Sequence, residues 1–272
     1  MRDFYAPSQR APLDQAHGLR QLFAGASRHV LPLAANPHLP FSGVVLDRLA
    51  AVLAAQGHQV LVVDASATSP APHELAAVEL AACVERLAPR VSYLPARGLP
   101  RAHVDTRGSA ASFIDALQHA APQADVILLH ADGADLVRLF KRRAVRPILL
   151  GADHPESIKH AYANCKLLVQ RCALMSFDLL LAAAPSSPRA TPIAESLAGC
   201  AEGFLGATLM HTALIDPAGD ATEPADDALT RLLAAQMALD MTQHDTATAA
   251  APLPPLPRLR LPELTPNRSV LR

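Results

Sequence analysis

The strongest constraint on the fold is a regular alternation between short apolar runs and longer stretches with helical periodicity. The apolar runs occupy residues 29–35, 59–66, 91–96, 124–134, 146–153, 177–185 and 208–216. The helical stretches occupy residues 44–56, 72–88, 109–121, 155–172, 191–206 and 225–240. Apolar runs that alternate with helices are typical of parallel strands buried on both faces. We therefore predict an α/β fold with a mostly parallel sheet covered by helices on both faces.

Composition narrows the class of protein further. The chain has 272 residues, 50% of them apolar, which is enough to build a sizeable core. Its formal net charge of -1 argues against general nucleic-acid binding, which needs a basic face, and we expect the basic run KRRAVR at 141–146 to be solvated surface. The four cysteines contain no CxxC pair, and no apolar segment marks the amino terminus. We expect a soluble, cytoplasmic protein with reduced thiols.

The domain organisation follows from shifts in composition. We predict a flexible leader over residues 1–12, a short helix over 13–28, one α/β domain over 29–241 and a disordered tail over 242–272. The tail contains APLPPLPRLRLPELTP, in which prolines recur too often for a helix or an inner strand.

Common catalytic and metal-binding patterns are missing from the sequence. Neither GxSxG nor HExxH occurs, so we predict no catalytic residues. His154, His160 and Cys165 do not share a helical face, and we predict no metal site. The last helical stretch carries an apolar stripe, which we interpret as a core contact rather than a membrane anchor. That stripe consists of Leu229, Leu232, Leu233 and Met237.

A series of motifs resembles one family. Residues 14–20, DQAHGLR, resemble the DQAxxLR box of the FlhG (FleN) family, MinD/ParA-type ATPases that set flagellar number. Three more stretches are similar to blocks of that family and follow in the same order, at 50–66, 154–168 and 204–215. The resemblance covers about residues 13–240 and implies a P-loop NTPase fold of the MinD/ParA type.

The same resemblance places the family's phosphate-binding loop, GKGGVGKT, on residues 36–43, which read NPHLPFSG. Four residues stand at glycine positions that let backbone amides approach phosphates: Asn36, His38, Leu39 and Phe41. Pro37 stands at the signature lysine, Ser42 at the second lysine and Gly43 at the magnesium-binding threonine. Pro40, like Pro37, has no amide donor. Shape, charge and metal ligand are lost together, so we predict a pseudo-ATPase without ATP or magnesium. The alternative is an active MinD-type ATPase with an unorthodox loop.

At other positions where the family contacts nucleotide or magnesium, this sequence also lacks most of the family's residues. Asp64 is kept, but Ser66 replaces the second carboxylate of the family's DAD. His130 stands where an acidic residue would polarise the magnesium shell, and Asp132, two residues later, leaves a slipped register open. The asparagine that meets adenine is replaced by an alanine run at 182–184.

The amino-terminal box implies a partner. In the family this element binds FlhF, a GTPase of the signal-recognition-particle type, and stimulates its GTP hydrolysis. The glutamine placed at the GTPase site corresponds to Gln15, and its matching neighbours are Asp14, Ala16, Leu19 and Arg20. Two alternatives stay open: Gln15 is a surface residue on a packed helix, or the protein is a plain scaffold for flagellar switch or transcription proteins. Because ATP bridges the family's dimer, its loss implies a monomer or a nucleotide-free contact. The tail cannot form the family's membrane-binding helix.

Overall fold

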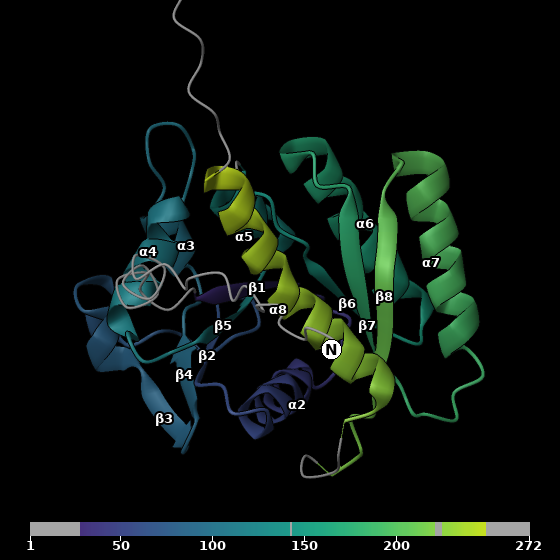
Figure 1. Cartoon of the computed structure of the whole chain (residues 1–272), viewed down its shortest axis with the longest axis horizontal. Helices are drawn as coiled ribbons and strands as arrows, with labels where there is room; N and C mark the ends of the chain where they lie inside the picture. Colours follow the sequence, from purple (N-terminus) through teal and green to yellow (C-terminus); the bar gives the residue numbers. More distant parts are fainter. Residues whose placement is uncertain (1–27, 142, 221–224, 249–272) are drawn as a thin grey trace, which may run out of the picture.

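The computed structural model describes residues 28–141, 143–220 and 225–248, with side chains up to residue 239. These residues form one α/β unit around an eight-stranded sheet (Figure 1). The strand order is β3-β4-β2-β5-β1-β6-β7-β8, and all strands run parallel except β3. The strands are β1 (His29–Ala34), β2 (Val60–Asp64), β3 (Glu85–Ala88), β4 (Val91–Pro95), β5 (Val126–Ala131), β6 (Ile148–Ala152), β7 (Ser176–Ala182) and β8 (Thr208–Ile215).

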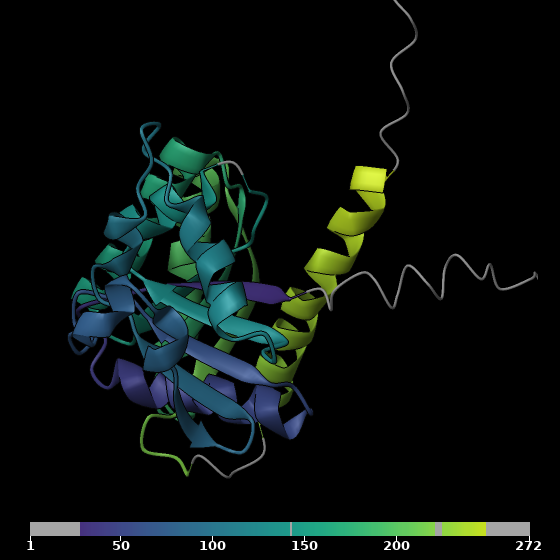
Figure 2. The ribbon, with the colours of Figure 1, turned by 90° about the vertical axis from the view of Figure 1, so that its left-hand side faces the viewer.

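The helices divide between the two faces of the sheet. They are α2 (Ser42–Ala55), α3 (Leu99–Ala102), α4 (Ala111–Ala120), α5 (Gly133–Phe140), α6 (Pro155–Cys172), α7 (Ala190–Leu205) and α8 (Asp227–Thr248). Side chains of α4, α5, α6 and α7 pack into one core cluster, and those of α2 and α8 into the other. Figure 2 shows α8 along one side of the sheet, with its carboxyl end standing clear of the domain. The predicted fold class is confirmed.

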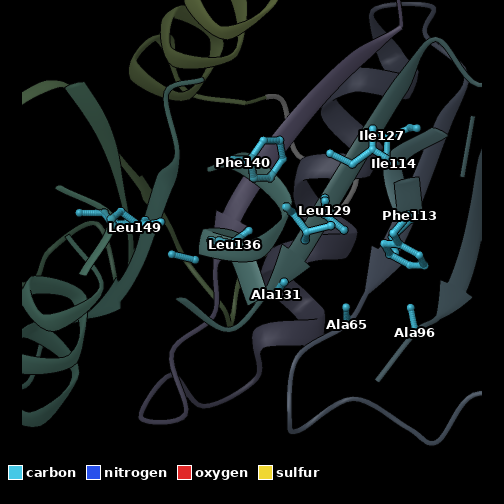
Figure 3. Packing of buried hydrophobic residues seen from close by; sticks show 14 of the residues in the cluster. Ala65, Ala96, Phe113, Ile114, Ile127, Leu129, Ala131, Leu136, Phe140 and Leu149 are labelled. Carbon is cyan, nitrogen blue, oxygen red and sulfur yellow. The ribbon is translucent and has the colours of Figure 1, made fainter. Parts of the chain in front are cut away.

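The larger core cluster lies between the sheet and α4 to α7. Phe113 and Ile114 from α4 and Leu136 and Phe140 from α5 are fully or almost fully buried against the strands (Figure 3). On the other face, the apolar stripe of α8 packs against the sheet, and its three leucines are buried. The interpretation of this stripe as a core contact is therefore confirmed.

The prediction of a helix over residues 72–88 is wrong. This segment forms two 3-10 turns, Glu74–Ala77 and Leu80–Cys83, followed by β3. Leu75 and Val78 are 54% and 88% exposed, so no apolar helical stripe is buried here. Instead, β3 turns back antiparallel along β4, which would otherwise be an unpaired outer strand. Edge pairing satisfies the backbone of β4 and overrides the local helical preference.

Other differences concern the ends and the short helices. The sequence pattern did not predict α3 or α5, and α8 continues past Asp240 to Thr248, into the segment assigned to the tail. The basic run is not wholly solvated, because Arg146 is only 7% exposed and its Nε donates to Asp178 at 2.9 Å. In the described part of the chain, no helix is long and apolar enough to cross a membrane.

Candidate functional site: the loop after the first strand

The carboxyl ends of the parallel strands define where a ligand would bind in this fold. The chain leaves β1 for β2 on one side, and β6 pairs with β1 on the other. Such a change of direction opens a crevice at the carboxyl edge of the sheet, where open α/β proteins bind ligands. Residues 35–41, which contain most of the predicted degenerate loop, lie at this point between β1 and α2.

Asn36 fastens the loop to the neighbouring strand and helix. Its side chain is buried, and its amide Nδ2 lies 2.9 Å from the backbone oxygen of Leu150 in β6. The same nitrogen lies 2.8 Å from the backbone oxygen of Ser157 and 2.9 Å from its Oγ, both in α6. A buried polar group must find partners, and Asn36 finds them within the protein, on β6 and α6. Asn36 thus acts as a structural tether.

The backbone amides of the loop are already used or missing. Pro37 and Pro40 carry no N–H. The N–H of His38 donates to Asn36 Oδ1 at 3.1 Å, and the N–H of Leu39 donates to Asn36 O at 2.9 Å. A phosphate-binding nest needs successive amides that point toward the anion. From residue 37 to 40 the loop has no such amide to offer.

The outer surface of the loop is mostly apolar, with His38 as an exposed polar side chain. Phe41 is 71% exposed and adopts a left-handed backbone with φ of 61°, a conformation that is uncommon for residues other than glycine. Such local strain persists only where the surrounding structure enforces it. Pro37, Pro40 and Val44 are exposed beside it, while Leu39 is buried beneath. The loop is therefore a fixed apolar protrusion rather than an open cradle.

Helix α6 supplies further tethers to the loop. Asn164 donates its Nδ2 to the backbone oxygen of Ala35 at 2.9 Å. His154 caps the start of α6, and its Nε2 lies 2.8 Å from the backbone oxygen of His38. These hydrogen bonds have structural roles, since they fix the loop on α6. No group of three or more His, Cys, Asp or Glu side chains within the described ranges could hold a metal ion.

The sequence did not single out Ser157 or Asn164 as part of the site. They are buried polar residues seven positions apart, on the face of α6 that also buries Ala161 and Leu168. A polar residue in an otherwise apolar helical stripe is a signal of a specific buried hydrogen bond. The sequence therefore contained the sign that Ser157 and Asn164 make buried hydrogen bonds. It did not show that their partners lie in the loop after β1.

Asp64 and His130 form a buried pair at the ends of β2 and β5. They are direct neighbours in the sheet, and His130 Nδ1 lies 2.8 Å from Asp64 Oδ1. Ser66 donates its Oγ to the same oxygen at 2.9 Å. Burial alone would raise the pKa of Asp64, but the hydrogen bonds and charge of His130, together with Ser66, lower it below its usual value. Asp64 is thus held as a carboxylate.

The pair leaves one polar atom without a partner. His130 is 1% exposed, and its Nε2 is buried with no hydrogen-bond partner among the described residues. Asp132 lies beyond the end of β5, where its Oδ1 accepts the N–H of Ala67 at 3.4 Å. In the sheet register it is therefore His130, not Asp132, that stands beside Asp64.

A nucleoside triphosphate with magnesium does not fit these residues. The loop contains no lysine, Gly43 offers no hydroxyl for the metal, and the amides of His38 and Leu39 are engaged. Asp64, the carboxylate that the resemblance retains, is bonded to His130 and Ser66. Phosphate binding in P-loop proteins depends on these missing groups.

The predicted partner-binding box lies outside the described residues. Its members are Asp14, Gln15, Ala16, Leu19 and Arg20. The predicted leader and most of the predicted tail also lie outside them.

Comparison with known proteins defines the class of the fold. No protein-family model matches the chain, and no curated protein matches its sequence. The eight-stranded, mostly parallel sheet with helices on both faces is the P-loop NTPase fold of the MinD/ParA type.

Individual solved structures show the likeness. A plasmid partition protein from Borrelia burgdorferi matches with a TM-score of 0.51 and 7% identity, over 79% of this chain and 99% of that one. A putative plasmid partition protein from Borrelia burgdorferi B31, bound to AMPPNP, matches with a TM-score of 0.50 and 7% identity, over 80% and 99%. The MinD cell division protein of Aquifex aeolicus gives 0.49 and 12% identity, over 84% and 100%. At such identities the likeness establishes the fold alone.

Proposed function

We propose that this protein is a cytoplasmic regulator of flagellar number and placement, similar to the FlhG (FleN) type. Its α/β domain would be a MinD-like scaffold that does not hydrolyse ATP. Its amino-terminal DQAxxLR element would bind the signal-recognition-particle-type GTPase FlhF and stimulate GTP hydrolysis there.

The closed loop after β1 is the observation that carries the proposal. Asn36 ties this loop to β6 and α6, and the loop has no lysine and, from residue 37 to 40, no free amide for a phosphate. A scaffold that keeps the fold but not this chemistry has to act through its surfaces. The block at 154–168 that resembles the flagellar family is the helix α6 that supplies Ser157 and Asn164.

Gln15 is the residue to which we assign the stimulating role. A neutral side-chain amide both donates and accepts hydrogen bonds, so it can orient a water molecule for attack on a γ-phosphate. Supplied in trans, it would complete a partner's active site without any chemistry in its own domain.

Substituting Gln15→Ala tests this role directly. We expect stimulation of the purified FlhF GTPase to fall about tenfold or more, toward the basal rate, because the water-orienting amide is lost. Circular dichroism should show unchanged folding. Gln21→Ala, six residues further along the same segment, is the matched control and should retain stimulation. Undiminished stimulation by Gln15→Ala would show that the box has another role.

A second candidate function is favoured by the apolar protrusion of the loop. Phe41, Pro37 and Pro40 offer a protein-docking surface on the carboxyl edge of the sheet. The protein would then be a plain scaffold for flagellar switch or transcription proteins. Deleting residues 1–28 separates the two functions, since retained partner binding favours the scaffold and lost binding favours the box.

A further inference from the structure

The outer strand β8 borders a groove. In the part of the chain that the structure describes, β8 pairs with β7 on one side and with no strand on the other. A groove of about 400 Å³ runs between β8 and α7. Its walls are formed chiefly by Ala190, Ala194 and Ala198 of α7 and by Leu209, Thr212 and Leu214 of β8.

The edge lacks the usual protection against an added strand. The eight residues of β8, TLMHTALI, contain neither a charged side chain nor a proline. Natural edge strands are commonly blunted by lysine, proline or a covering segment. The charged side chains that line the groove, Glu195 and Asp226, are both acidic and exposed. The groove thus suits an extended segment with apolar side chains and positive charge.

We propose that residues 257–262 of this chain, PRLRLP, occupy this groove as an added strand on β8. In an extended segment alternate side chains share a side, so Leu259 and Leu261 face one way and Arg258 and Arg260 the other. The leucines pack against the alanines of α7, and the positive charge of the segment is attracted to Glu195 and Asp226 at the rim.

Composition supports this occupant. Residues 249–272 contain four arginines and one glutamate, opposite in sign to the lining of the groove. Prolines at 257 and 262 flank the run, and proline is tolerated at the ends of a strand and in an outermost strand. The added strand would become the new outer strand and carry the proline protection that β8 lacks.

The chain is long enough to reach the groove. Helix α8 begins directly after Asp226 and its 22 residues span about 33 Å. Residue 259 lies eleven residues beyond the end of α8, and an extended chain of that length spans up to roughly 36–40 Å. Leu259 can therefore return along α8 as far as Asp226.

Tryptophan fluorescence tests the proposal in the full chain, which contains no native tryptophan. We expect Leu259→Trp to emit at shorter wavelength than Leu271→Trp and to be less accessible to acrylamide, because only the first enters the groove. Adding Glu195→Lys should abolish the difference. Glu202→Lys, also exposed on α7 but outside the groove, is the matched control and should leave it unchanged.

Other outcomes overturn the proposal. Solvent-like emission from both Leu259→Trp and a second probe, Leu261→Trp, would show that this segment does not dock. A blue shift that appears only as the protein concentration rises would mean that the segment binds another copy. A shift that survives both Glu195→Lys and Arg258→Glu with Arg260→Glu would place the segment elsewhere.

Discussion

At the scale of single residues, polar side chains beside the loop after β1 bind the protein itself. The side-chain amide of Asn36 finds three acceptors on β6 and α6. The carboxylate of Asp64 is engaged by His130, whose Nδ1 lies 2.8 Å from Oδ1 of Asp64. The amide of Asn36 and the carboxylate of Asp64 are thus engaged within the protein, which leaves less of either for a ligand.

The Asp64 pair leads to a prediction about pH. For Asp64→Asn we expect the free energy of unfolding at pH 7 to fall by about 1–3 kcal/mol, since hydrogen bonds to a charged acceptor are stronger. The folded-state pKa of Asp64 is lowered below its usual 3.8. Its stabilisation is therefore present above pH 3.8 and is lost as the pH falls through the lower folded value.

Urea denaturation over a pH series checks this prediction. The difference between wild type and Asp64→Asn should shrink as the pH drops below about 4. Asp47→Asn, at an exposed position on α2, should change stability by no more than about 0.5 kcal/mol. A difference for Asp64→Asn that stays constant with pH would contradict the assigned carboxylate.

At the scale of elements, α5 and α6 position the loop after β1. The first residue of α5, Gly133, packs so closely on α6 that an added Cβ would lie 2.4 Å from Oδ1 of Asn164. Asn164 in turn holds the backbone oxygen of Ala35. The geometry of the loop therefore depends on a contact between two helices.

We expect Gly133→Ala to destabilise the protein by about 1–3 kcal/mol, because the methyl group must displace Asn164. Gly199→Ala in α7 is the control, since nothing lies within 4 Å of its added Cβ. That substitution should stabilise the protein by up to about 1 kcal/mol through helix propensity. Denaturant unfolding measures the change in the free energy of unfolding for both variants. Equal changes would contradict the proposed role of the close contact between Gly133 and Asn164.

The elements also show what a sequence alone can predict. Strands announced by apolar runs appear where expected, and α6 begins at Pro155 as its helical pattern indicates. The eight-residue helix α5 was missed because its start, GAD, resembles a turn. Residues 72–88 did not form the helix that their pattern indicates, because the end of this segment pairs with β4 as β3. Within the site, the altered loop is visible in the sequence, but Asn36 and Ser157 lie 121 residues apart and only the fold joins them.

At the scale of the whole molecule, buried polar contacts join the sheet to the helical layers on both faces. Helix α8 is held by Gln236, whose Nε2 donates to the backbone oxygen of Arg146 and to Asp178 at 2.9 and 2.7 Å. Asp178 is fully buried and also pairs with Arg146. A buried carboxylate such as that of Asp178 needs hydrogen bonds, and the one from Gln236 ties α8 to β7.

Calorimetric titration of the purified full-length protein with ATP and magnesium tests the central claim most directly. Because the loop after β1 lacks both lysines, and because the amides of His38 and Leu39 are engaged and Pro37 and Pro40 have none, we predict no binding heat at millimolar ATP, corresponding to an affinity weaker than about -4 kcal/mol. A saturable, magnesium-dependent isotherm in the micromolar range would contradict the account, because the loop would then have to open and the protein would be an active nucleotide switch.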